Sequence, residues 1–162
     1  MSKNLRYLTQ GAIIAALYVA LTWLSHMVGL ASGVIQFRLS EALTILPFFT
    51  PAAVPGLFVG CLLANLLTGG LPWDVVIGSV ATLLGAIGTR LFRRYRWLAP
   101  VPPILSNAII IPFVLRYVYG AEGALYYFAF TVGIGQIVTC GALGLLLLHA
   151  LLPNRKLFGS LE

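Results

Sequence analysis

Long apolar runs, separated by few charged residues, extend along the chain from Leu8 to Leu152. A soluble domain needs about a quarter of its residues charged to cover its surface. Here 9% of the 162 residues are charged and 60% are hydrophobic. A helix crosses the hydrocarbon core of a bilayer with about 20 apolar residues, and with somewhat fewer where the bilayer thins. The pattern therefore predicts a polytopic membrane protein.

Charges, prolines and glycine pairs divide the apolar sequence into candidate helices at residues 8–30, 39–50, 53–68, 74–92, 102–119 and 123–150. We therefore predict an all-α bundle of six transmembrane helices, the second and third of them short. Pro47, Pro51 and Pro55 leave two interpretations of this short pair open: two thin crossings or a re-entrant hairpin. Because no polar stretch is long enough to form a separate module, we expect residues 1–162 to form a single domain.

Basic residues are distributed unequally between the two sides of the predicted bundle. One side carries Lys3, Arg6, Arg90, Arg93, Arg94, Arg96, Arg155 and Lys156, whereas the other carries Arg38 and Arg116. Cytoplasmic loops are enriched in Lys and Arg, so we expect both termini and the Arg-rich loop at 90–96 to be cytoplasmic. The net charge of +6 does not predict nucleic-acid binding, because no basic patch carries interleaved aromatic residues.

Small residues recur at four-residue spacing in two of the predicted helices. The first helix carries Ala12, Ala16 and Ala20, and the third carries Gly56, Gly60 and Ala64. Such stripes let helices approach closely within a membrane, so we expect another helix against each. From the residues alone, packing within the chain and docking of a partner subunit both remain open.

Several polar side chains are expected at one depth near the outer face. They are Arg38 and Glu41 at the start of the second helix, Asn65 near the end of the third, and Trp73 and Asp74 at the start of the fourth; Gln136 is nearer the midplane of the last helix. Polar groups at membrane depth are costly, so they usually line a cavity or pair with each other. We interpret this set as a small-molecule pocket.

Simpler roles for some of these residues also remain open. Arg38 and Glu41 could pair only with each other, tryptophans often form interfacial belts, and Asp74 suits the first turn of a helix.

Common catalytic and metal-binding motifs are missing from the sequence. It contains no P-loop, no HExxH, no CxxC and no GxSxG, and these patterns mark nucleotide hydrolysis, metal binding and serine nucleophiles. The sequence therefore predicts neither an enzyme nor a bound cofactor or metal. It also lacks the two matching halves typical of secondary transporters, which favours a binding protein that depends on a partner for energy.

The stretch from Gln36 to Arg90, QFRLSEALTILPFFTPAAVPGLFVGCLLANLLTGGLPWDVVIGSVATLLGAIGTR, resembles the queuosine-precursor transporter family. This family comprises substrate-binding (S) components of energy-coupling factor (ECF) transporters. The resemblance implies a prokaryotic plasma-membrane protein that captures a 7-deazaguanine, preQ0 or preQ1, at the outer face. It also implies a partner module of two cytoplasmic ATPases and one transmembrane coupling protein. Ala12, Ala16 and Ala20 would then face this module, with Gly56 and Gly60 as further docking candidates.

The depth and chemistry of the two acids predict specific roles for them with such a ligand. A carboxylate can accept the adjacent N–H donors of a guanine-like edge, and such charge-assisted hydrogen bonds are strong. Either Glu41 or Asp74 would bind this edge, and the other would meet the side arm of the ligand. Arg38 would hold one of the two carboxylates in its ionised state.

The remaining predicted site residues complete the contacts to the ring. Asn65 and Gln136 would serve the carbonyl and pyrrole groups, and Trp73 would stack on the ring. Two other functions stay open from the sequence: an S component for another vitamin-like molecule, and a membrane scaffold protein without a ligand.

Overall fold

The computed structural model describes residues 2–31 and 35–158, and the regular elements within these ranges are all helical. They are α1 (Lys3–Met27), η1 (Leu39–Phe48), α2 (Ala53–Leu67), α3 (Pro72–Leu91), η2 (Arg96–Leu98), α4 (Val101–Phe113), η3 (Val114–Val118), α5 (Leu125–Gln136), η4 (Ile137–Leu143), α6 (Gly144–Leu151) and η5 (Leu152–Phe158). The segments η3 and η4 are π-helical and continue α4 and α5 without a break. With these continuous segments joined, the described residues form six main helices: α1, η1, α2, α3, α4–η3 and α5–η4–α6. The predicted all-α bundle of six helices is therefore confirmed.

Within residues 2–31 and 35–158, four helical stretches are long and apolar enough to cross a membrane: Lys3–Met27, Pro72–Leu91, Arg96–Val118 and Leu125–Lys156. The helices η1 and α2 are also apolar but have 10 and 15 residues.

Local sequence sets several helix ends. The Ser2 side chain caps α1 by accepting a hydrogen bond from the N–H of Leu5, and Pro72 begins α3, where no backbone donor is needed.

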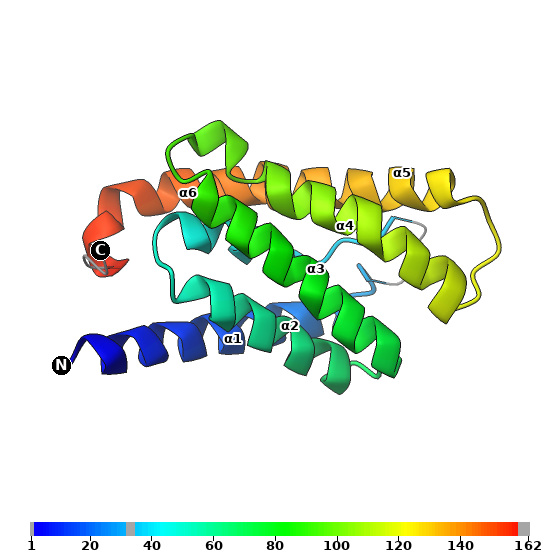
Figure 1. Cartoon of the computed structure of the whole chain (residues 1–162), viewed down its shortest axis with the longest axis horizontal. Helices are drawn as coiled ribbons and strands as arrows, with labels where there is room; N and C mark the ends of the chain where they lie inside the picture. Colours follow the sequence, from blue (N-terminus) through cyan, green and yellow to red (C-terminus); the bar gives the residue numbers. More distant parts are fainter. Residues whose placement is uncertain (1, 32–34, 159–162) are drawn as a thin grey trace.

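The long helices run along a common direction, and their connections gather at two ends of the bundle (Figure 1). The start of α1, the end of α6 and the turn between α3 and α4 lie at one end, which we call the terminal end. The α2–α3 and η3–α5 connections lie at the opposite end. The Arg-rich loop at 90–96 is therefore at the same end as the first and last described residues.

The short helix η1 lies in the interior of the bundle. Eight of its ten residues are buried, and it runs antiparallel to α1. Thr22 near the end of α1 donates a hydrogen bond to Ser40, whereas Gln10 near the start of α1 accepts one from Thr50. Because the chain thus reaches the terminal end before α2 begins, the structure favours two short crossings over a re-entrant hairpin.

The small-residue stripe of α2 packs against α1 of the same chain. A Cβ atom added at Gly56 would lie 2.7 Å from the carbonyl oxygen of Gly11, and one added at Gly60 would lie 2.9 Å from Cβ of Tyr18. The two backbones therefore approach as closely as such stripes allow. The other stripe has a different position, since Ala12, Ala16 and Ala20 are all exposed on the outward face of α1.

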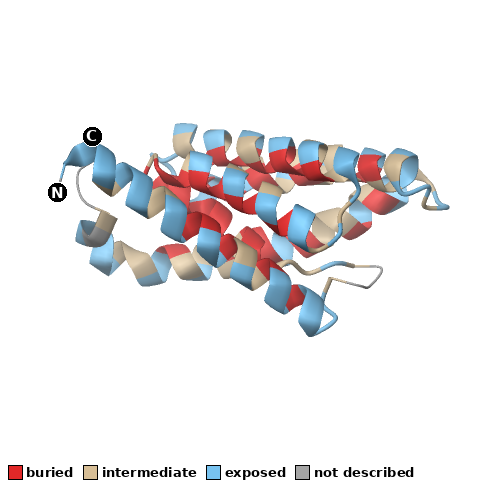
Figure 2. Ribbon diagram, turned by 90° about the horizontal axis from the view of Figure 1, so that it is seen from below, coloured by how far each residue is buried: buried red, intermediate tan, exposed pale blue. Residues whose placement is uncertain are grey.

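Buried residues gather along the interior of the bundle, and the outward faces of the helices are exposed (Figure 2). These outward faces carry large apolar side chains such as Leu8, Leu17, Leu84 and Ile109. Such a surface is unsuited to water and suited to lipid chains. The interior also contains buried polar side chains, including Glu41, Asn65, Asn107 and Gln136.

Candidate functional site

Glu41, near the start of η1, is a buried carboxylate that contacts three other helical segments. The Tyr18 hydroxyl on α1 donates to Oε1 at 2.5 Å, and Nδ2 of Asn107 on α4 donates to Oε2 at 3.2 Å. The thiol of Cys140 on η4 lies 3.9 Å from Oε2. Glu41 is 2% exposed. A buried charge is costly without hydrogen-bond partners, and these contacts supply them.

Gln136 reaches the same cluster through Cys140. The Cys140 thiol donates to Oε1 of Gln136 at 2.9 Å, one helical turn away. Gln136 is the last residue of α5, and Cys140 lies in the π-helical segment η4. Single π-helical segments are uncommon and frequently occur at functional sites. We call Tyr18, Glu41, Asn107, Gln136 and Cys140 the inner cluster.

A second polar group lies closer to the end of the bundle opposite the terminal end. Arg38 precedes η1, and its Nη2 atom donates to Oδ1 of Asn65 on α2 at 2.8 Å. Asn65 is buried, and its Nδ2 atom lies 3.6 Å from the sulfur of Cys61. Among the described residues, Arg38 forms no ion pair within 4.0 Å. Its charge is therefore stabilised here by an amide oxygen, and no carboxylate touches it.

The turn between α2 and α3 brings Asp74 next to Asn65. Gly69 adopts a φ of 78°, which favours glycine, and the N–H of Gly70 donates to the carbonyl oxygen of Asn65 at 2.8 Å. A Cβ atom at Gly78 would lie 3.2 Å from Nδ2 of Asn65 and 3.5 Å from Oδ1 of Asp74. Glycine at 78 therefore leaves room for both side chains.

Asp74 also accepts a hydrogen bond from the loop after η3. The Tyr119 hydroxyl donates to Oδ2 of Asp74 at 2.7 Å. Burial, and next this hydrogen bond, raise the pKa of the Tyr119 phenol above its ordinary value. Tyr119 therefore keeps its proton at neutral pH and remains a donor to Asp74. We call Arg38, Asn65, Asp74 and Tyr119 the outer cluster.

The structure brings together five of the six predicted ligand-binding residues in these two clusters. Trp73 is separate from them and is 68% exposed. Successive helical residues point about 100° apart, so with Asp74 facing Asn65 and Tyr119, Trp73 turns outward. The predicted pairing of Arg38 with a carboxylate is likewise not present as a contact.

Sequence reasoning did not assign Tyr18, Asn107, Cys140 and Tyr119 to the site. Asn107 is an amide within a predicted membrane helix, and this feature alone marks it as a candidate. Tyr18 and Cys140 lie in apolar runs where no local pattern distinguishes them from packing residues. Tyr119 follows the last apolar residue of its helix, so its partner on α3 depends on the fold.

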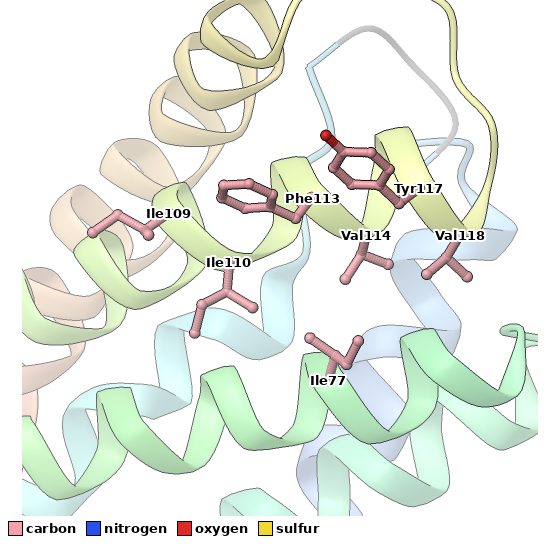
Figure 3. A pocket seen from close by; sticks show the side chains of 7 residues that line it. All are labelled: Ile77, Ile109, Ile110, Phe113, Val114, Tyr117 and Val118. Carbon is pink, nitrogen blue, oxygen red and sulfur yellow. The ribbon is translucent and has the colours of Figure 1, made fainter.

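Two apolar grooves on the outer surface contain none of the polar cluster residues. One lies between α3 and α4–η3, where Ile77 points toward Ile110 and Val114 (Figure 3). The other is lined by Ala16, Val19, Ala20, Trp23, Leu24, Met27, Leu63 and Leu67 of α1 and α2. Within a bilayer, such grooves can be filled by lipid chains or by another apolar helix.

A family model described as QueT transporter matches residues 8–153. The chain belongs to the QueT transporter family. This confirms the family that residues 36–90 resemble, and it agrees with four candidate membrane spans in a multi-pass membrane protein.

One curated member of the QueT family aligns with part of the chain. The chain is 38% identical over 87 residues to the queuosine precursor transporter QueT of Lactococcus lactis subsp. cremoris (strain MG1363). The alignment covers 52% of this chain and 50% of that relative, so it spans about half the length of the curated protein. No solved structure matches the chain.

Proposed function

We propose that this QueT family chain binds a queuosine precursor, a 7-deazaguanine such as preQ0 or preQ1, as the S component of an ECF-type importer. Membership of the family and the name of the Lactococcus lactis relative, a queuosine precursor transporter, support the substrate class. The observation that carries the proposal is the buried carboxylate of Glu41, surrounded by hydrogen-bonding groups inside an apolar bundle. Ionisable groups at membrane depth usually serve function.

The carboxylate of Glu41 keeps capacity for a ligand. A carboxylate offers about four acceptor positions. The strong donors in the chain are Tyr18 on Oε1 and Asn107 on Oε2, so one position on each oxygen remains. The adjacent N–H donors of a guanine-like edge match this pair of acceptors. Glu41 would bind that edge, and Gln136 would contact the pyrrole side of the ring.

The outer cluster suits the rest of the ligand. Asp74 has a second carboxylate oxygen, Oδ1, that does not receive the Tyr119 hydrogen bond. This oxygen would meet the side arm of the ligand, including the aminomethyl cation of preQ1. Asn65 lies beside Asp74 and accepts a hydrogen bond from Arg38. Through this bond it would help to place the ring carbonyl. The side chain of Trp73 faces outward, so ring stacking by Trp73 requires the residue to change its conformation.

We further propose that the terminal end faces the cytoplasm. Lys3, Arg6, the loop at 90–96 and Arg155 belong to this end, in keeping with the enrichment of basic residues in cytoplasmic loops. The outer cluster then lies on the outer side of the bundle, where an importer captures its ligand. Residues 1–162 would act as one domain of a prokaryotic plasma-membrane protein.

The exposed face of α1 is the proposed docking surface for the energy-coupling module. Ala12, Ala16 and Ala20 are exposed, and the last two border the apolar groove between α1 and α2. A transmembrane coupling protein could approach this smooth face closely. Gly56 and Gly60 are buried beneath it, so their role would be to hold α1 against α2. The chain lacks a P-loop, and the two ATPases of the module would supply the energy.

An uptake assay tests this proposal directly. Cells that make the chain together with the module should accumulate labelled preQ0 or preQ1, and cells that make either part alone should not. Purified chain should bind the same ligands and release a purine-like chromophore on denaturation. A different co-purified chromophore would indicate another vitamin-like substrate. Uptake without the module, or no binding of either deazaguanine, would contradict the proposal.

A further inference from the structure

Arg38 has hydrogen-bonding capacity that the chain does not use. An arginine side chain carries five N–H donors in a planar fork. Nη2 donates to Asn65, whereas the buried Nε atom has no hydrogen-bond partner among the described residues. A buried donor without a partner destabilises the structure that holds it. Such an atom inside a polar cluster is expected to meet an acceptor that arrives with a ligand.

The acids of the site do not supply this acceptor. Glu41 and Asp74 are close enough to interact electrostatically with Arg38, yet neither forms an ion pair with it within 4.0 Å. Glu41 is held instead by Tyr18 and Asn107, and Asp74 is held by Tyr119. Each carboxylate is therefore oriented by neutral donors, and the guanidinium is left available to a ligand.

The position of Arg38 indicates which part of the ligand it would contact. Arg38 and Glu41 lie three residues apart at the start of η1. In a guanine-like ring, the carbonyl oxygen is adjacent to the ring N–H that a carboxylate accepts. A ligand edge bound by Glu41 would therefore present its carbonyl oxygen on the side where the guanidinium of Arg38 lies. Arginine is the side chain most often used to bind the carbonyl edge of guanine.

We propose that Arg38, held in place by Asn65, binds the ring carbonyl of the ligand and makes the chain select 6-oxo over 6-amino deazapurines. The inference rests on the proposed function. An amino group at this position would point N–H donors at the donors of Arg38, and the guanidinium cannot lose its proton to accept them. Asn65 is a positioning residue, because its amide oxygen is already bonded to Nη2.

A binding competition with purified chain tests the inference. The probes are 7-cyano-7-deazaguanine and its 6-amino counterpart, in which an amino group replaces the carbonyl oxygen and the adjacent ring nitrogen loses its hydrogen. Wild-type chain should prefer the 6-oxo compound by about 100-fold or more, since sites built to hydrogen-bond a group strongly reject analogues that lack it. Arg38→Met should weaken binding of the 6-oxo compound by about 10- to 100-fold, the loss expected for a charge-assisted bond. The 6-oxo preference should then fall by about 10-fold or more, and the part that remains comes from the contact between Glu41 and the ring N–H.

Two further variants separate direct contact from a structural effect. Arg38→Gln keeps a neutral N–H donor and should retain part of the preference. Arg116→Met removes the other predicted outer arginine, which is exposed and donates to the carbonyl oxygen of Gly123, and it should leave the preference unchanged. Thermal midpoints show which variants remain folded.

The outcomes distinguish this inference from the proposed function. Folded Arg38→Met or Arg38→Gln protein that keeps the full 6-oxo preference would overturn the role of Arg38, while deazaguanine binding by the wild type would leave the proposed function standing. Wild-type chain that binds neither compound would overturn the proposed function and this inference together. A fall of the preference by about 10-fold or more in Arg38→Met, with Arg116→Met unchanged, supports the inference.

Discussion

The hydroxyl group of Tyr18 donates a hydrogen bond to Oε1 of Glu41 at 2.5 Å, between the middle of α1 and the start of η1. Both side chains are buried. The opposite face of the same helix carries the exposed residues Ala12, Ala16 and Ala20. The helix α1 therefore contacts the proposed ligand site on one side and presents the proposed docking surface on the other. A shift of α1 caused by ligand binding would therefore also move the proposed docking surface, and a shift caused by docking would move Tyr18.

Replacing Tyr18 with phenylalanine should destabilise the fold. The variant removes the donor to Oε1 of Glu41 and leaves a buried acceptor without its partner, which costs about 1.5–3 kcal/mol when the acceptor is charged. A lower thermal midpoint of purified Tyr18→Phe protein would show this loss. Tyr126→Phe is the matched control, because Tyr126 is 81% exposed. Equal midpoints for the two variants would mean that the Tyr18 bond contributes no net stability.

The positions of the long helices could be predicted from the sequence. The expected helices at 74–92 and 123–150 correspond to Pro72–Leu91 and to Leu125–Leu151 across α5, η4 and α6. Within lipid, the backbone N–H and C=O groups of a span must form hydrogen bonds with each other, so each span is helical. The position of a long apolar run therefore predicts the position of a helix. The interior placement of η1 could not be predicted, because its buried side chains contact α1, α4 and η4, which lie far from it in the sequence.

The composition of the site was predictable in part. Polar residues at membrane depth are rare, so their presence alone makes candidates of five residues that the structure places in the two clusters: Arg38, Glu41, Asn65, Asp74 and Gln136. Their partners depend on tertiary contacts. Arg38 and Asn65 lie 27 residues apart, and Glu41 and Asn107 lie 66 apart, and no local pattern encodes such pairs. The contact of Glu41 with Tyr18 in the middle of α1 is likewise not evident from the position of Glu41 at a helix start.

Gly56→Ala should weaken the packing of α2 on α1. The added methyl group would lie 2.7 Å from the carbonyl oxygen of Gly11, so the two backbones must separate. Overpacking of this kind typically costs about 1–3 kcal/mol, and the thermal midpoint should fall accordingly. Gly133→Ala is the control, since its nearest neighbouring atom would be 4.0 Å away; it should be neutral or slightly stabilising. A Gly56→Ala protein as stable as wild type would contradict the close contact.

Glu41→Gln and Asp74→Asn should each weaken binding of preQ1 by the purified chain. Each change removes one negative charge and replaces one carboxylate oxygen, an acceptor, with an NH2 group, which is a donor. Loss of one charge-assisted hydrogen bond corresponds to about a 10- to 100-fold change in affinity. Asp74→Asn should affect preQ1 more than preQ0, because preQ1 carries the cationic side arm. Full affinity in both variants would show that neither acid belongs to the ligand site.

Ala16→Leu should separate ligand binding from uptake. Ala16 is exposed on α1, so a larger side chain leaves the interior unchanged and binding of preQ1 by the purified chain should stay at the wild-type level. The bulkier face should hold a partner helix away, and module-dependent uptake should fall by about 10-fold, as for the loss of about 1.4 kcal/mol at an interface. Ala142→Leu, on the exposed face of η4, is the control. Equal uptake in both variants would show that the exposed face of α1 is not the docking surface.

The bond between Tyr119 and Asp74 predicts a dependence of stability on alkaline pH. Burial, and next the hydrogen bond to Asp74, raise the pKa of the Tyr119 phenol above its ordinary value of about 10. The folded chain therefore holds this proton more tightly than the unfolded chain, so the contribution to stability is complete below pH about 10 and is lost as the pH rises through the folded-state pKa. The thermal midpoint of the wild type should fall more steeply than that of Tyr119→Phe above pH about 10. Parallel curves for the two proteins, with Tyr126→Phe as a reference, would show that the bond between Tyr119 and Asp74 does not stabilise the fold.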